Sequence, residues 1–134
     1  MVMEGGCLCG SIRYRVDQPI IDAGYCHCRL CQRASGAPTV AWLTVPAGGF
    51  RYVRGTVAVF ASSPGHQREF CPVCGTQIAF RARVNPRTVD VTLGSLDEPA
   101  RIEPEYHIWC DSKPAWLHLA DDLPRYRDAG PDEG

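Results

Sequence analysis

Cys71-Pro72-Val73-Cys74-Gly75 is the stretch of this 134-residue sequence that decides the fold. Its two-residue spacer lets both sulfurs reach one metal ion while backbone N–H groups turn toward the thiolates. Gly75 can take the left-handed backbone conformation that such a turn tends to need. The flanking segments, 67–70 and 77–82, have β-type patterns, and apolar residues alternate in the second. The stretch therefore predicts a β-hairpin with a zinc knuckle, as in a zinc ribbon.

Two further cysteines, Cys7 and Cys9, supply what one knuckle lacks, because a knuckle offers only two ligands. Residues i and i+2 of a strand point to the same face, so these two sulfurs suit one metal ion. Four thiolates form a closed tetrahedral zinc site, and such a site contributes directly to folding. We therefore expect Cys7, Cys9, Cys71 and Cys74 to bind one structural zinc ion.

A third group of cysteines, in Cys26-His27-Cys28-Arg29-Leu30-Cys31, offers only three sulfurs. Three thiolates leave one tetrahedral position on a zinc ion for water or a substrate sulfur, so Cys26, Cys28 and Cys31 predict an open, catalytic site. Zinc with three thiolates is electron-rich and suits another thiolate better than it suits hydroxide. The alternative is a second closed site, with a fourth ligand from His66, His107, His118, Cys110 or His27.

The eight cysteines would form four disulfides in a secreted protein, but the sequence favours metal binding. The N-terminal residues lack a basic segment followed by an apolar one, so no signal peptide is visible. In the cytosol thiols stay reduced, and clustered cysteines there bind metal more often than they form disulfides. We therefore expect a cytoplasmic protein with two zinc ions per chain.

The net charge and the hydropathy pattern limit the kinds of partner that we expect for the chain. The net charge of −1 gives no bulk attraction to nucleic acid or to an anionic membrane. No apolar run approaches the roughly 18 residues of a membrane span. All but one of the 14 cationic residues are arginine, the exception being Lys113. Arginine binds carboxylates bidentately and would suit an acidic thiol such as glutathione, although solvated surface arginines explain the same count.

Short β-prone segments alternate with turns along the whole chain. The 11 prolines and 13 glycines fit many turns and no long helix. Strands are expected at 12–16, 40–45, 50–54, 56–60, 67–70, 77–82, 89–93 and 105–109. Segments 50–54 and 56–60 predict a hairpin around Gly55, and 29–34 predicts a short helix that ends at Gly36. The fold class is all-β, with one zinc-binding domain over 1–127 and a frayed tail over 128–134.

The cysteine groups and their surroundings resemble a known family. The landmarks, in order, are Gly6-Cys7-x-Cys9-Gly10, Cys26-His27-Cys28-x-x-Cys31, Gly36-Ala37-Pro38 with Trp42, Phe70-Cys71-x-x-Cys74-Gly75-Thr76, His107-x-Trp109 and Lys113-Pro114-x-Trp116. In this order and spacing the chain resembles the glutathione-dependent formaldehyde-activating enzymes, a family that also includes centromere protein V. The resemblance implies the β-tent, a zinc-dependent fold of several small coiled antiparallel sheets. It also implies the division of the cysteines into four structural and three catalytic ligands.

The type activity of that family joins glutathione to formaldehyde as S-hydroxymethylglutathione, formally a carbon–sulfur lyase reaction. The resemblance thus implies a small thiol such as glutathione, held as thiolate at the open zinc position, whose sulfur attacks an aldehyde carbon. His107, or else His66, would deliver a proton to the new alkoxide. Arg33 would face a substrate carboxylate. The structural alternatives are a packed, hydrogen-bonded His107 and a solvated Arg33.

Two other functions fit parts of the sequence. The same fold could serve as a non-enzymatic zinc module that binds a protein, and a closed second zinc site would favour that interpretation. Methionine sulfoxide reductases of the B type share the β-tent and pair a four-cysteine zinc with a late reactive cysteine, a role open to Cys110. That interpretation leaves Cys26, Cys28 and Cys31 unexplained, and Cys110 also fits a small buried side chain.

Overall fold

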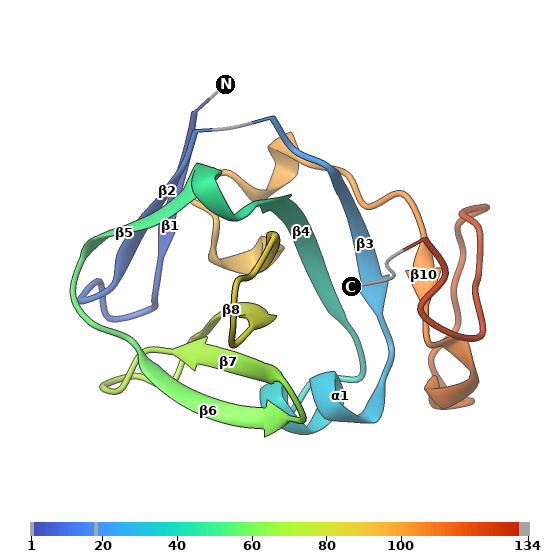
Figure 1. The fold of residues 1–134 in the computed structure, drawn as a ribbon. Helices are drawn as coiled ribbons and strands as arrows, with labels where there is room; N and C mark the ends of the chain where they lie inside the picture. Colours follow the sequence, from blue (N-terminus) through green and yellow to red (C-terminus); the bar gives the residue numbers. More distant parts are fainter. Residues whose placement is uncertain (1, 18, 132–134) are drawn as a thin grey trace.

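The computed structural model describes residues 2–17 and 19–131 (Figure 1). Its strands are β1 (Met3–Gly6), β2 (Arg13–Val16), β3 (Asp22–Cys26), β4 (Val40–Pro46), β5 (Phe50–Arg54), β6 (Ala58–Ser63), β7 (His66–Phe70), β8 (Gln77–Ala82), β9 (Thr88–Thr92) and β10 (His107–Ile108). Besides α1 (Arg29–Ser35), the described chain has the short 3-10 turns η1 (Ala47–Gly49), η2 (Leu93–Ser95), η3 (Pro99–Arg101) and η4 (Cys110–Ser112). The predicted all-β class is confirmed. In the described ranges, no helix has the length and apolar character that crossing a membrane requires.

The strands form two sheets. β1, β2 and β5 make an antiparallel sheet on the left of Figure 1. The other strands make a mixed sheet in the order β10-β3-β4-β9-β8-β7-β6, in which β10 runs parallel to β3 and the remaining neighbours are antiparallel. In Figure 1, β6, β7 and α1 lie at the bottom, and the chain that follows β10 lies at the right.

The main core joins the two sheets. Tyr14 and Val16 alternate with arginines on β2, and both are fully buried. They belong to one cluster with Leu43 of β4 and Val91 of β9, which are buried to the same degree. Alternation places one face of each strand in this cluster, because successive side chains of a strand point to opposite sides. Cys71 lies in the same cluster, so the knuckle is anchored where the two sheets meet.

A smaller apolar cluster lies where β3, α1 and β10 meet. It consists of Cys26, Cys31, Trp42, Tyr106 and Ile108. The ring of Tyr106 packs directly on the backbone of β3 at Gly24, where an added Cβ would lie 2.3 Å from a ring carbon. This cluster holds the three-cysteine segment against the sheet.

Helix α1 begins within the cysteine group and ends where the sequence predicts. Cys28 is its N-cap, and the Cys28 sulfur accepts the backbone N–H of Cys31 at 3.3 Å. Gly36 takes the left-handed conformation at φ 73°, and its N–H donates to the carbonyl of Gln32 at 2.7 Å. Glycine tolerates this conformation without a Cβ clash, which is why it ends the helix.

The hairpin predicted around Gly55 is wrong. β5 pairs with β2 and β6 pairs with β7, so these two consecutive strands belong to different sheets. Gly55 lies at φ 79°, and an added Cβ would lie 2.2 Å from the carbonyl oxygen of Ser11. The glycine therefore lets the chain pass tightly against the first sheet before it crosses to the second.

The strand predicted over 105–109 is shorter than expected. β10 covers only His107–Ile108, because Trp109 takes a left-handed conformation at φ 57°. The backbone N–H of Trp109 donates to the carbonyl of Asp128 at 2.9 Å. Part of the tail expected to fray, residues 132–134, lies outside the described residues.

Candidate functional site

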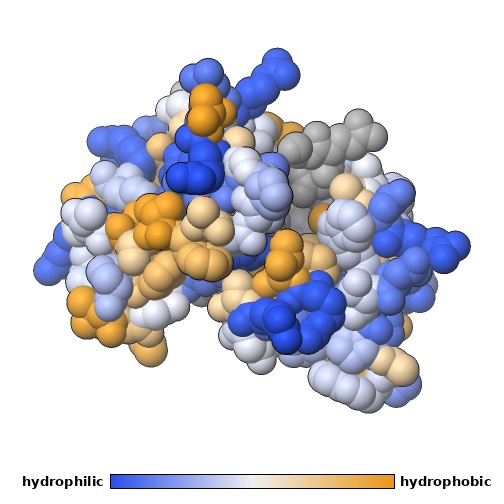
Figure 2. All heavy atoms as spheres, turned by 60° about the horizontal axis from the view of Figure 1, so that its bottom comes forward, coloured by the Kyte–Doolittle hydropathy of each residue, from blue (hydrophilic) through white to orange (hydrophobic). Residues whose placement is uncertain are grey.

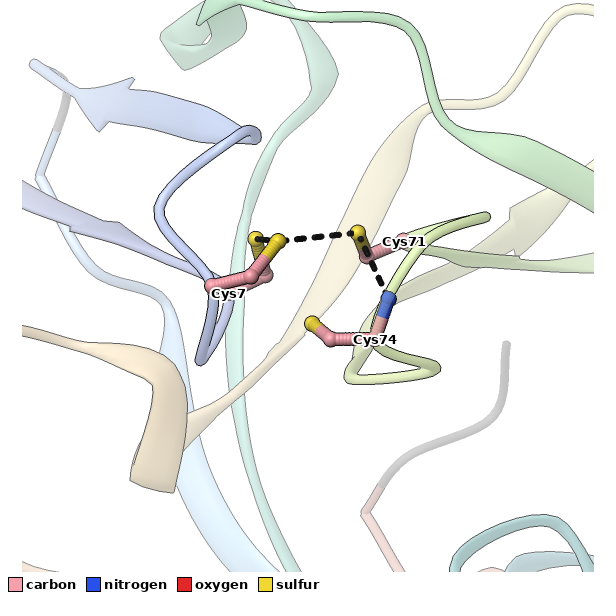
Figure 3. Close-up of side chains that lie close together, drawn as sticks. Cys7, Cys71 and Cys74 are labelled. Carbon is pink, nitrogen blue, oxygen red and sulfur yellow. Dashed lines mark hydrogen bonds between the residues drawn. The ribbon is translucent and has the colours of Figure 1, made fainter.

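Four cysteines converge from two distant segments of the chain. Cys7 and Cys9 lie in the turn after β1, and Cys71 and Cys74 lie in the turn between β7 and β8 (Figure 3). Their four sulfur atoms all lie within 4.8 Å of one another. The sulfur of Cys9 is 3.6 Å from that of Cys7 and 3.8 Å from that of Cys71. Two sulfurs bonded to one tetrahedral zinc at about 2.3 Å are about 3.8 Å apart, so this donor set fits zinc.

Hydrogen bonds favour the charged form of Cys74 and Cys7, whereas at Cys9 the hydrogen bonds with Ser11 are outweighed by burial and by the Cys7 and Cys74 thiols, which raise its pKa. The N–H groups of Val73 and Cys74 donate to the sulfur of Cys71 at 3.3 and 3.4 Å, as a zinc knuckle requires. A hydrogen bond with the Thr76 hydroxyl lowers the pKa of Cys74 to about 5. At Cys7, burial opposes ionisation, but hydrogen bonds lower the pKa to about 7. Metal ligation needs deprotonated thiols, so the surroundings of Cys7 and Cys74 favour a bound cation.

The second group comes from one short segment. Cys26 ends β3, Cys28 caps α1, and Cys31 lies one turn into the helix. The sulfurs of Cys26 and Cys31 are 3.4 Å apart, and all three sulfurs lie within 4.8 Å of one another. Hydrogen bonds from Cys26 and then Cys31 lower the pKa of Cys28 to about 2, while the pKa values of Cys26 and Cys31 are raised. The convergence of three sulfurs fits a metal ion that binds soft sulfur ligands.

No fourth ligand completes the three-cysteine group within the described part of the chain. No other histidine, cysteine or carboxylate atom there lies within 4.8 Å of all three sulfurs. His27, the neighbour of two ligands, is fully buried and makes its hydrogen bond to His107 instead. A tetrahedral metal ion held by these sulfurs would keep one position open.

The three cysteines line a cavity of about 400 Å³. Its walls are mainly apolar and include Trp42, Phe80 and Ile108. A larger cavity, of about 800 Å³, adjoins it, since both are lined by His66, Phe80, Asp90 and Trp109. Figure 2 turns the bottom of Figure 1 forward and shows apolar side chains gathered on that face. A small molecule with an apolar body and a reactive sulfur therefore has a lined space beside the cysteines.

Three cationic or basic groups also line the small cavity: Arg29, His66 and Arg68. Nδ1 of His66 donates to the carbonyl of Pro64 at 3.2 Å, so Nε2 carries the lone pair of the neutral ring. The His66 ring stacks on Phe80 with centroids 5.2 Å apart. This packing holds His66 in a fixed orientation at the cavity wall.

His107, predicted as the proton donor, does not line either of these cavities. It alternates with Ile108 on β10, and Ile108 lines the cysteine cavity, so the His107 ring lies on the other side of the strand. Nδ1 of His107 lies 2.9 Å from Nε2 of His27, and Nε2 of His107 lies 2.9 Å from the carboxylate of Asp121. The ring also stacks on Tyr25. His107 is thus a packed, hydrogen-bonded histidine.

Arg33, predicted to face a substrate carboxylate, is also not at the cysteine cavity. It is exposed on α1 and lines a separate shallow groove with Pro114 and Trp116. Arg68, which was not predicted as a site residue, lines the cavity together with the three cysteines. His66 and Arg68 are two positions apart on β7, so both side chains lie on one face of the strand. This two-residue spacing is the feature of the sequence from which the position of Arg68 could have been predicted.

Cys110 lies apart from both cysteine groups and does not line the cysteine cavity. It begins η4, and its N–H donates to the carbonyl of Tyr126 at 3.0 Å. Burial raises the pKa of its thiol. A raised pKa disfavours the thiolate, which is the nucleophilic form.

Known proteins match this chain over most of its length. A model of the family described as glutathione-dependent formaldehyde-activating enzyme matches residues 2–112. A Halomonas elongata protein named "Putative glutathione-dependent formaldehyde-activating enzyme" is 26% identical over 129 residues, covering 89% of this chain and 82% of that protein. A crystal structure of a Rhodobacter sphaeroides protein shares the fold, with a TM-score of 0.59, 22% identity, and coverage of 92% of this chain and 99% of that one. The chain therefore belongs to the glutathione-dependent formaldehyde-activating enzyme family.

Proposed function

We propose that this protein is a zinc-dependent carbon–sulfur lyase that joins a glutathione-type thiol to an aldehyde such as formaldehyde. The observation that carries the proposal is the convergence of three sulfurs, without a fourth ligand among the described residues, on the wall of a lined cavity. Family membership supports glutathione and formaldehyde as the substrate pair. The free state of all eight cysteines suits a reducing compartment such as the cytoplasm.

The two cysteine groups take different roles in this proposal. Cys7, Cys9, Cys71 and Cys74 hold a structural zinc ion, because their four sulfurs form a complete donor set. Cys26, Cys28 and Cys31 hold the catalytic zinc ion. When bound there, zinc keeps the substrate sulfur as a thiolate at neutral pH and orients it.

His66 moves the proton. Its Nε2 lone pair accepts the proton of the substrate thiol, because Nδ1 is already bound to the Pro64 carbonyl. The sulfur then forms a bond to the aldehyde carbon, and the carbonyl oxygen becomes an alkoxide. Nε2–H of His66 returns the proton to that oxygen, which yields the neutral adduct and regenerates the histidine. Trp42 and Phe80 line the cavity and exclude water from the reacting atoms.

Zinc content of two matched variants tests the assignment. Wild-type protein purified under reducing conditions without chelator should contain two zinc ions per chain by elemental analysis. Cys31→Ser should retain about one ion, stay folded and lose the joining of glutathione to formaldehyde above the spontaneous rate. Cys74→Ser should lose the structural ion and cooperative unfolding. A Cys74→Ser protein that folds normally with two zinc ions would contradict the structural assignment, and an active Cys31→Ser protein would contradict the catalytic one.

A further inference from the structure

Arg68 is a buried cation in the wall of the cysteine cavity. Its side chain lies on β7 and the residue is only 6% exposed. Nη1 donates to Oε1 of Gln77 at 2.8 Å. The guanidinium carbon lies 5.0 Å from the ring centroid of Phe80 and 5.9 Å from that of Trp42. These contacts fix the plane of the guanidinium within the cavity wall.

The charge of Arg68 is not offset by a carboxylate ion pair. Within residues 2–17 and 19–131, the ion pairs do not include Arg68, and its neighbour Glu69 pairs with Arg81 at 2.7 Å. A buried charge without a counter-charge is strongly unfavourable. The group that Arg68 does contact is sulfur, since Nη2 donates to the sulfur of Cys31 at 3.6 Å. Asp90 lines the same cavity but accepts a hydrogen bond from Thr44, and the direct contact of Arg68 is with the three-cysteine group, whose thiolates would supply a counter-charge once a metal ion is bound.

We infer that Arg68 is the positioning residue that lets the three-cysteine centre accept an anionic sulfur ligand. A divalent ion with three thiolates carries a net charge of −1, and a further thiolate would raise this to −2. The guanidinium offsets one of these charges, and its N–H bond draws electron density from Cys31. This inference rests on the proposed function, because it takes zinc to be bound at Cys26, Cys28 and Cys31.

The test uses the full chain loaded with zinc and compares Arg68→Met, Arg68→Lys and the control Arg33→Met. Arg33 is exposed on α1 and lies outside the cysteine cavity. Zinc release to a chromophoric chelator should show one phase for each site. We expect Arg68→Met to accelerate one phase about 10- to 100-fold and to leave the other unchanged. Arg68→Lys, which keeps the charge, should give a smaller change, and Arg33→Met should match wild type.

A second readout follows thiol binding without turnover. Cobalt replaces zinc, and 2-mercaptoethanol, which has no carboxylate, is titrated while the sulfur-to-cobalt absorption is recorded. Arg68→Met should raise the dissociation constant about 10-fold, in line with loss of one outer contact to a metal ligand. Should Arg68→Met fail to fold by circular dichroism, Arg68→Gln keeps an N–H donor, removes the charge and provides the same comparison.

Three results would overturn the inference. The inference is wrong if Arg68→Met has the same zinc-release rates and the same thiol affinity as Arg33→Met. Weaker binding of thioglycolate with unchanged binding of 2-mercaptoethanol would make Arg68 a binder of substrate carboxylate instead. Wild-type protein with only one zinc ion would contradict the proposed function, and the role of Arg68 would fall with it.

Discussion

His66 and His107 show how a single step along a strand decides the environment of a histidine. His107 alternates with the cavity-lining Ile108, so its ring meets His27 and Asp121 on the opposite side. His66 begins β7 and lines the cavity. Both residues lie in β-prone sequence and qualify as proton carriers by residue type. Which of the two rings lies beside the cysteines depends on how β10 pairs with β3. That pairing joins distant segments of the chain and cannot be predicted from the local sequence pattern.

Replacement of His66 should impair catalysis without loss of metal. In the proposed mechanism His66 accepts and returns the proton, so His66→Asn should lower kcat about 100- to 10,000-fold. Nuclear magnetic resonance exchange between free and adduct forms of glutathione and formaldehyde measures the rate above the spontaneous background. The control is His118→Asn, at an exposed histidine outside the cysteine cavity. Wild-type rates in His66→Asn would exclude His66 as the proton carrier.

His27 should make the fold sensitive to mild acid. Burial, followed by the charges of His107 and Lys113, lowers the pKa of His27 from 6.5 to about 4. The unfolded chain therefore takes up this proton at a higher pH than the folded chain does. The free energy of unfolding should decrease as the pH falls from 6.5 to 4, by about 3 kcal/mol, and this contribution should be fully present above pH 6.5.

Urea unfolding with excess zinc between pH 4 and 7 measures this dependence, and the ¹⁵N shifts of the imidazoles identify the residue. His27 should keep a neutral ring at pH 5.5. A charged His27 at that pH would show that the ring is not shielded in the way its burial indicates.

At the scale of elements, the sequence predicted what local spacing controls. The β7–β8 hairpin with its cysteine turn and the short helix ended by Gly36 are present as predicted. The hairpin around Gly55 is wrong because β5 pairs with β2, more than 30 positions away in the chain. The cysteines of the site were foreseen, since their spacing is local. Arg68 was not foreseen, because only the packing of β7 beside α1 brings it to Cys31.

The knuckle turn should depend on Gly75 through backbone conformation alone. Gly75 lies at φ 79° with open space where a Cβ would be, so Gly75→Ala introduces strain without a steric clash. We expect a loss of about 1–2 kcal/mol in the free energy of unfolding. Gly94→Ala is the matched control, because that Cβ also meets open space and its φ is not in the left-handed range. If the two variants had equal midpoints of thermal unfolding, Gly75→Ala would not introduce the predicted backbone strain.

At the scale of the whole molecule, the two cysteine groups join different parts of the fold. Cys7 and Cys9 follow a strand of the first sheet, whereas Cys71 and Cys74 lie between two strands of the second. A metal ion bound by all four would therefore connect the sheets. Cys26, Cys28 and Cys31 lie within six residues, so a metal ion there would constrain only the start of α1.

Stability should accordingly follow the four-cysteine site. Free zinc at 1,000 times the dissociation constant of that site should stabilise the folded chain by about 4 kcal/mol. Thermal unfolding of Cys31→Ser at buffered zinc concentrations isolates this contribution, because only the four-cysteine group remains complete. A melting temperature that does not change with zinc would contradict the predicted connection between the sheets.

The distance between the cysteine groups along the chain also sets an order of events during synthesis. Cys7, Cys9, Cys26, Cys28 and Cys31 are all translated before Cys71 and Cys74. At about 5–20 residues per second, the 43 positions from Cys31 to Cys74 take about 2–9 s. For that interval the nascent chain presents five thiols without the pair that completes the four-cysteine set. Metal captured by the wrong sulfurs in those seconds would delay the closure of the two sheets. Under the proposed zinc assignment, the zinc supply during translation would therefore affect how this protein matures.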